Sequence, residues 1–264
     1  MPGRMIDGNG KTDYNTGSEL RKGRKTMHAY YEKKKDQLKE QMDGFLRLIA
    51  KELKACTDKP YADLFPEMWK YYEKKLLERF PYIGGDDVSG TATLTGAYFY
   101  VAMGEVLKKY GVSMQEIGHL SVLSYERQYK RMPKMVKRVM AKTWNYPSLL
   151  KKNYLKQDRK NQANAAKNPR SFQTQTVIPP EEGCAFSWRT TVCPLASFAW
   201  RYGYEEYLPW LCNLDYVMYG VLGVPFFRKQ TIADGADWCD FNIKYGVDPL
   251  PYWPPVFQQE NEYK

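Results

Sequence analysis

The fold class can be read from residues 193–243, which run CPLASFAWRYGYEEYLPWLCNLDYVMYGVLGVPFFRKQTIADGADWCDFNI. The first part carries apolar residues at helical spacing, and we expect helices over 195–202 and 205–222. The second part alternates between apolar and polar residues, which predicts a hairpin formed by 226–233 and 238–245 across an Asp-Gly-Ala-Asp turn. Helices followed by antiparallel strands indicate an α+β unit.

Helical patterns also dominate the chain before this stretch. Further helices are expected over 27–56, 64–80, 97–110, 114–129 and from Pro133 onward, with a loop over 84–96. Two strands are expected within 171–180 and 183–194, where Pro and Gly separate β-branched and aromatic runs. The predicted class is therefore α+β, with an N-terminal helical layer followed by a C-terminal unit of helices packed on a short antiparallel sheet.

Composition divides the chain into an arm and one domain. The 264 residues are 43% hydrophobic and 15% aromatic, which is enough for a sizeable core. Residues 1–25 are Gly-rich, polar and basic, and we expect a mobile basic arm. The single α+β domain over 26–264 is expected to comprise a helical part (26–150), an exposed linker (151–170), a helix-plus-sheet part (171–248) and a Pro-rich tail (249–264).

Hydropathy and cysteine usage indicate the compartment. No apolar run approaches the roughly 18 residues of a membrane span, and the first ten residues lack the apolar core of a secretory signal. The chain has 5 cysteines, an odd number that argues against a disulfide framework. We therefore expect a cytoplasmic protein with no membrane partner.

Positive charge is concentrated in the middle of the chain. The formal net charge is +10, and residues 127–170 carry 14 basic side chains against Asp158 alone. Such a block is typical of a solvated helical face with a surface loop, or of a surface that binds nucleic acid. Because the chain has no zinc finger, aromatic ribonucleoprotein signature or Gly-rich clamp, we expect no nucleic-acid partner. The sequence leaves open whether the chain forms a homo-oligomer.

Most familiar catalytic motifs are missing. The chain has only 2 histidines, which excludes His-rich metal sites, and it has neither a phosphate-binding loop nor a dinucleotide fingerprint. We expect no cofactor and no metal. A zinc site formed by Cys193, Cys212, Cys239 and Asp215 is an alternative, but these positions lack the short paired spacing of structural zinc sites.

The chemistry is expected in residues 184–245, which hold four of the five cysteines. Cys212 and Asp215 are three residues apart on a predicted helix, so they share a face. A thiolate is a strong nucleophile, whereas an Asp can act as a general base on water or pair with an amidinium group. Arg228 can bind a substrate carboxylate through two hydrogen bonds. Free cysteines are also among the most buried residue types, so each is equally a candidate core residue.

The same residues carry a resemblance to a known family. Cys193, the acidic pair 205–206, Cys212-x-x-Asp215 and the pattern Arg-x-x-Thr-Ile-x-x-Gly-x-x-x-Cys-Asp-Phe of 228–241 resemble the L-2-amino-thiazoline-4-carboxylic acid hydrolase family. This resemblance covers about residues 180–245. It implies a hydrolase that opens a cyclic amidine-like ring, a thiazoline bearing an amino group and a carboxylate, to a carbamoyl-cysteine product.

The resemblance also implies roles for individual side chains. Asp215 would bind the amidinium group or activate water, Cys212 or Cys239 would line the pocket or attack the ring carbon, and Arg228 would hold the carboxylate. The predicted catalytic residues are Asp215, Cys212, Cys239 and Cys193. The predicted substrate-binding residues are Arg228, Glu206, Thr231 and His119, of which His119 lies among apolar helix residues and is equally a core histidine.

Two other functions are alternatives to a hydrolase, for which a larger planar ring stacked on aromatic side chains is an alternative substrate. One is a lyase or isomerase that acts on a small ring in the same pocket. The other is a non-catalytic small-ligand-binding module, because Gly-x-x-x-Cys-x-Phe is also similar to vinyl-reductase-type binding domains. An enzyme should place Asp215, Arg228 and at least one of the three cysteines around one pocket that solvent can reach.

Overall fold

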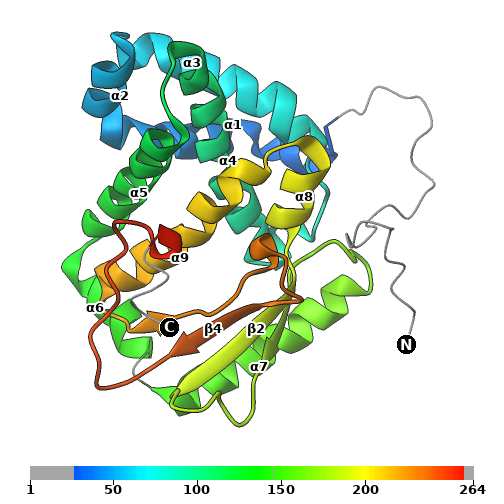
Figure 1. Ribbon diagram of the computed structural model, residues 1–264. Coiled ribbons are helices and arrows are strands. Elements are labelled where there is room, and N and C mark those ends of the chain that lie inside the picture. Colours follow the sequence, from blue (N-terminus) through cyan, green and yellow to red (C-terminus); the bar gives the residue numbers. More distant parts are fainter. Residues whose placement is uncertain (1–26, 145, 259–264) are drawn as a thin grey trace.

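The computed structural model describes residues 27–144 and 146–258, in which a layer of helices packs on a small sheet (Figure 1). The helical layer contains α1 (Ala29–Leu46), α2 (Ala50–Thr57), α3 (Tyr61–Tyr71), α4 (Gly90–Leu107) and α5 (Met114–Lys130). The helix expected over 27–56 is interrupted by a 3-10 turn at Arg47–Ile49. The arm expected over 1–25 lies outside the described residues. None of the helices in the described ranges combines the length and the apolar character needed to cross a bilayer.

Helix α4 forms the centre of the helical layer. It contacts α1, α3, α5 and α8, and its residues Tyr98–Gly104 are all buried. A helix that is apolar on every side belongs in a protein core. The loop expected over 84–96 is therefore wrong in its second half, because α4 already begins at Gly90. The Thr-rich start of the helix reads as polar, but Thr95 satisfies its hydroxyl internally by donating to the carbonyl of Thr91 at 3.0 Å.

The sheet has four antiparallel strands in the order β1-β2-β4-β3. The strands are β1 (Gln173–Thr176), β2 (Phe186–Val192), β3 (Phe226–Phe227) and β4 (Cys239–Ile243). The expected hairpin forms between β3 and β4, with Phe226 paired to Ile243, although β3 spans only two residues. The α+β class with helices on a short antiparallel sheet is confirmed.

The exposed linker expected over 151–170 is wrong. After α6 (Lys134–Trp144), residues 147–165 form helix α7 (Pro147–Ala165), which packs on β1. Its inner face buries Leu150, Asp158 and Asn161. Two of these are polar, so the inner face shows no apolar period from which a helix could be predicted. Asp158 accepts hydrogen bonds from the hydroxyl of Thr174 at 2.8 Å and from Thr176 N at 2.7 Å, which stabilises the carboxylate at low exposure.

Helix α9 (Leu208–Leu222) follows α8 (Pro194–Tyr202) and lies between α5 and the sheet (Figure 1). The two helices α5 and α9 approach closely at Gly118. A Cβ atom at this position would lie 1.9 Å from the Trp210 ring, so only glycine allows this contact. This close packing fixes the position of α9 and of the side chains that it presents to the sheet.

The Pro-rich tail packs back along α9 over its described part, to residue 258. Asn213 donates to the carbonyl of Tyr252 at 3.1 Å and accepts from Val256 N at 3.0 Å. The ring of Trp253 stacks on His119 of α5 with 4.3 Å between ring centroids. The tail therefore covers its own domain at the α5–α9 junction.

Candidate functional site

A buried ion pair joins α9 to the strand hairpin. Arg228, directly after β3, lies 2.8 Å from Asp215 of α9 through its Nη1 and the carboxylate Oδ2. Its Nη2 donates to the carbonyl oxygen of Cys212, one turn earlier, at 2.7 Å. The arginine side chain is only 5% exposed. Both terminal nitrogens of Arg228 thus bind one turn of α9. This is possible because Cys212 and Asp215 are three residues apart and lie on the same face of the helix.

Aromatic rings enclose the guanidinium group. Its central carbon lies 5.5 Å from the ring centroids of Tyr216 and Phe226 and 5.2 Å from that of Phe241. The negative faces of such rings stabilise a cation that has left water. The sequence-based expectation that Arg228 binds a substrate carboxylate does not fit this geometry, since the guanidinium is buried and both Nη atoms already donate to protein oxygens.

Asp215 is the more exposed residue of the ion pair. Its side chain is 38% exposed, and within the described residues Oδ1 has no hydrogen-bond partner, whereas Oδ2 binds Arg228. Burial raises the pKa of the Asp215 carboxyl group above its ordinary value, and the charge of Arg228 opposes part of that rise. A carboxylate with a raised pKa, a fixed orientation and a free oxygen has the properties of a general base.

Three cysteines lie near enough to this carboxylate for its charge to raise their pKa values. Cys193 precedes α8, Cys212 lies on α9, and Cys239 begins β4, where its sulfur accepts from Ile232 N at 3.2 Å. Burial raises the pKa of Cys193 to about 12, with a contribution from Cys239. Burial also raises the pKa of Cys212 well above its ordinary value, although the charge of Arg228 acts in the opposite direction. The thiols are therefore protonated at neutral pH, a state in which sulfur is a poor nucleophile.

The same side chains do not form a metal site. Among the residues that the structure describes, no group of three or more His, Cys, Asp or Glu side chains is arranged to hold a metal ion. The zinc alternative that combined Cys193, Cys212, Cys239 and Asp215 has no such geometry here.

A hollow of about 360 Å³ lies between α7, the start of α4 and the sheet. One face of α7 supplies four carboxamide side chains to it, from Asn153, Gln157, Asn161 and Asn164. The predicted site omits these residues because a linker is expected over 151–170. A signal was nevertheless present, since 153, 157, 161 and 164 are spaced by three or four residues and so share one helical face.

Ser171 marks the hollow as a place with unused hydrogen-bonding capacity. The residue is 1% exposed and lines the hollow, and its hydroxyl has no partner among the described residues. Tyr154 and Trp188 supply aromatic walls. Burial raises the pKa of Tyr154, and the negative charge of Asp215 adds to this rise. Tyr154 therefore belongs both to the wall of the hollow and to the surroundings of Asp215.

Two of the other predicted substrate-binding residues lie elsewhere. Glu206 pairs with Lys108 at the surface of the helical layer. His119 is exposed and stacks on Trp253 of the tail. Thr231 directly precedes Ile232, whose N–H donates to the Cys239 sulfur, but its hydroxyl caps a short turn by donating to Asp234 Oδ2 at 2.6 Å and accepting from Asp234 N.

Comparison with known proteins gives one match. A family model described as L-2-amino-thiazoline-4-carboxylic acid hydrolase matches residues 100–243. The matched region begins within α4 and ends with β4, so it includes the ion pair, the three cysteines and the part of the hollow that α7 and the sheet line, but not the lining residues before position 100. No curated protein and no solved structure matches the chain.

Proposed function

Because the chain belongs to the L-2-amino-thiazoline-4-carboxylic acid hydrolase family, we propose that it is a hydrolase that opens a small cyclic amidine-like ring bearing a carboxylate. The observation that carries this proposal is the state of Asp215, whose Oδ2 accepts from Arg228, whose Oδ1 has no hydrogen-bond partner among the described residues, and whose side chain is partly exposed. The name of the family supports hydrolysis, and the site supplies a base for it.

The proposed reaction adds water across one bond of the ring. The oxygen of water bonds to the carbon between the ring nitrogen and the ring sulfur, and Asp215 Oδ1 accepts one proton from that water. The carbon–sulfur bond then breaks, and the sulfur leaves with its electron pair and receives the proton that Asp215 carried. The second hydrogen of water ends on the ring nitrogen, so a thiazoline with an amino group becomes a ureido thiol. Water is the only co-reactant that the balance of this reaction needs.

Arg228 acts in this scheme as a positioning residue. Its two contacts with one turn of α9 hold Asp215 in one orientation and leave Oδ1 without a protein donor among the described residues. The three cysteines lie near enough to the carboxylate for its charge to raise their pKa values, and burial keeps their thiols protonated. We therefore assign the base to Asp215 and give no nucleophilic role to Cys193, Cys212 or Cys239.

The amide-lined hollow provides the route to the site in this proposal. Its volume of about 360 Å³ suits a ligand of one ring with its substituents. Carboxamides and the Ser171 hydroxyl offer hydrogen bonds to a polar ring. Asp215 does not itself line the hollow; Tyr154 is a lining residue whose pKa is raised in part by the charge of Asp215. All five cysteines are free, which fits our expectation of a cytoplasmic enzyme.

A ring-opening assay tests the proposed function. The purified chain is incubated with 2-amino-thiazoline-4-carboxylate and with other cyclic amidines and hydantoins, and products are identified by mass spectrometry. We expect one substrate class to gain the mass of one water molecule, with a free thiol appearing for the thiazoline. As a matched control, Cys56→Ala in α2, in the helical layer, should leave the rate unchanged. Ligands that bind without any such product would instead identify a binding module, and a product of unchanged mass would identify an isomerase.

A further inference from the structure

Helix α6 exposes apolar side chains that no other described part of the chain covers. Met135 is 77% exposed and Val139 is 61% exposed, and no residue of the helix is fully buried. Val136 belongs to the same stripe, while Met140 and Trp144 on the adjoining side pack partly on the core. Water does not favour an apolar stripe of this kind, and such a patch on a protein that is otherwise well packed marks an interaction surface.

Positive charge surrounds this stripe. Helix α6 carries Lys134, Lys137, Arg138 and Lys142, and α7 carries Lys151, Lys152, Lys156, Arg159 and Lys160. None of these nine side chains has an ion-pair partner among the described residues, in contrast to Arg127 and Lys130 at the end of α5. The acidic residue of α7, Asp158, is buried and bonded to β1, so it neutralises nothing at the surface.

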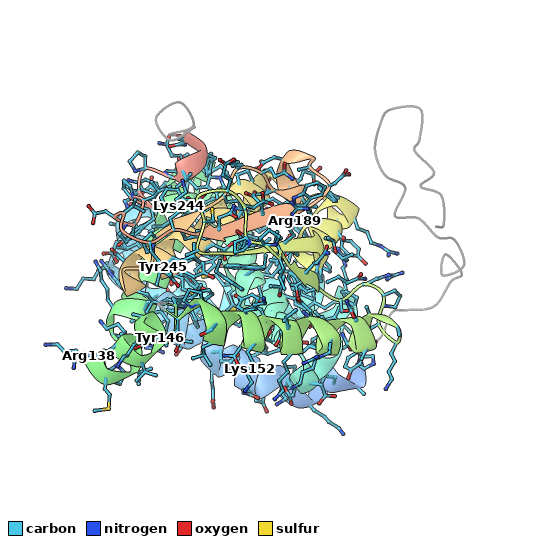
Figure 2. The ribbon with its side chains drawn as sticks, turned by 90° about the horizontal axis from the view of Figure 1, so that it is seen from below. Arg138, Tyr146, Lys152, Arg189, Lys244 and Tyr245 are labelled. Atoms are coloured by element: carbon cyan, nitrogen blue, oxygen red, sulfur yellow. The ribbon has the colours of Figure 1, made fainter. Side chains whose placement is uncertain are left out.

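The apolar and basic residues lie on one side of the molecule. Figure 2 shows Arg138 of α6, Tyr146 between the two helices, and Lys152 of α7 along the same edge. Tyr146 and Leu149 are also exposed at this junction. Residues 152, 156, 159 and 160 share the outer face of α7, because the inner face of that helix contacts the sheet. We call this surface, formed by α6 and the outer side of α7, the α6–α7 face.

We propose that the α6–α7 face binds the surface of a lipid bilayer that contains anionic phospholipids. Amphipathic helices with exposed Met, Val and Leu beside Lys and Arg lie in the headgroup region of such bilayers, where the apolar side chains enter the acyl boundary and the cations bind phosphate. The aromatic ring of Tyr146 suits the same interface. This inference goes beyond the proposed hydrolase activity, and it differs from the expectation of no membrane partner, which rested on the absence of a spanning segment.

The chemistry of the face favours lipid over two other occupants. Nucleic acid binds cations and stacks on aromatic rings, and exposed Met135 and Val139 would add nothing to such a contact. A second copy placed on the same face by two-fold symmetry would bring nine uncompensated cations against nine others. Of these three occupants, the anionic lipid surface is the one that uses both the charge and the apolar stripe.

The test is co-sedimentation of the full chain with vesicles. Vesicles of phosphatidylcholine mixed with phosphatidylserine are compared with vesicles of phosphatidylcholine alone. We expect binding to the anionic vesicles only, weakening as the salt concentration rises. The variant K152E/K156E should bind at least about tenfold more weakly, since two cations become anions. The variant M135S/V139S should also bind several-fold more weakly at unchanged charge.

A matched control uses exposed lysines far from the face. The variant K51E/K54E changes the net charge by the same amount on α2, at the opposite end of the molecule (Figure 1), and should bind anionic vesicles nearly as well as the parent chain. Absence of vesicle binding at low salt would overturn the proposal. Equal binding by M135S/V139S and the parent chain would also overturn it and indicate a general polyanion site, to be checked with duplex DNA. Loss of a dimer in K152E/K156E, without any vesicle binding, would assign the face to self-association.

Discussion

Two half-buried carboxylates, one in the helical layer and one beside the sheet, have opposite environments. Glu105 of α4 accepts hydrogen bonds from Tyr71 at 3.0 Å, from Tyr207 at 2.8 Å and from Lys108 at 2.8 Å, so both of its oxygens are used. Burial favours a higher pKa for Glu105, but these three donors outweigh it and lower the pKa below its ordinary value. At Asp215 one donor residue, Arg228, does not outweigh burial, and the pKa is raised.

These sites differ in the number of donors that bind the carboxylate. A fully bonded carboxylate is held ionised and has no oxygen left for a reactant, so it stabilises the fold. A carboxylate with one free oxygen and a raised pKa can take a proton from water. Function is therefore expected at Asp215 and not at Glu105.

The largest expected effect follows from removing the partner of Asp215. Arg228→Ala leaves a carboxylate without its cation and opens a space between Tyr216, Phe226 and Phe241. We expect the free energy of unfolding to fall by about 3–5 kcal/mol. Urea denaturation followed by circular dichroism measures this change. A loss below about 1 kcal/mol would show that the pair is not buried in the way described.

Glu105→Gln tests whether the other carboxylate contributes to stability but not to turnover. The substitution keeps the shape of the side chain but replaces one acceptor oxygen with an amide, so donors around Glu105 lose their partner. We expect the free energy of unfolding to fall by about 1–3 kcal/mol, and the turnover number measured well below the melting temperature to stay unchanged. A large loss of turnover in this variant would show that Glu105 also takes part in the reaction, which would contradict the contrast between the two carboxylates.

The pH dependence of the reaction should report the raised pKa of Asp215. The base must be deprotonated, so kcat/KM should fall about tenfold per pH unit below that pKa. Since burial raises the pKa, the acidic limb should lie above the ordinary value of about 3.9 for an aspartate. A pH–rate profile measures the limb directly. A limb at or below the ordinary value would place the titrating group elsewhere.

The smallest effect is expected at the thiols. Cys212→Ala removes a protonated sulfur that burial keeps from ionising, so we expect kcat to change by less than about fivefold. The same holds for Cys193→Ser. Steady-state kinetics of the two variants beside the parent chain decide this point, because loss of a true nucleophile would lower kcat by orders of magnitude.

The sequence was informative where the chemistry depends on local spacing. Cys212 and Asp215 share one turn of α9, and this turn could be recognised before the position of Arg228 was known. The helix–strand order of 193–243 likewise predicted the class of fold. Such local patterns hold in the folded protein because the geometry of a helix places residues three apart on the same face, whatever the helix packs against.

The sequence was misleading where a polar face is buried. Helix α7 reads as a linker because Asp158 and Asn161 face inward, and their hydrogen-bond partners Thr174 and Thr176 become visible only when β1 is in place. The family pattern predicts Glu206 as a substrate-binding residue, yet its carboxylate pairs with Lys108, a residue 98 positions away along the chain. Such contacts between distant segments cannot be derived from spacing.

Turnover by Asp215→Asn tests the proposed role of this carboxylate. The substitution keeps the size of the side chain and the contact with Arg228 but removes the base. We expect kcat on the ring-opened substrate to fall by about 10²–10⁴-fold, while circular dichroism and substrate binding stay close to those of the parent chain. Turnover at the parent rate would contradict the account, because the free oxygen of Asp215 would then have no part in the reaction.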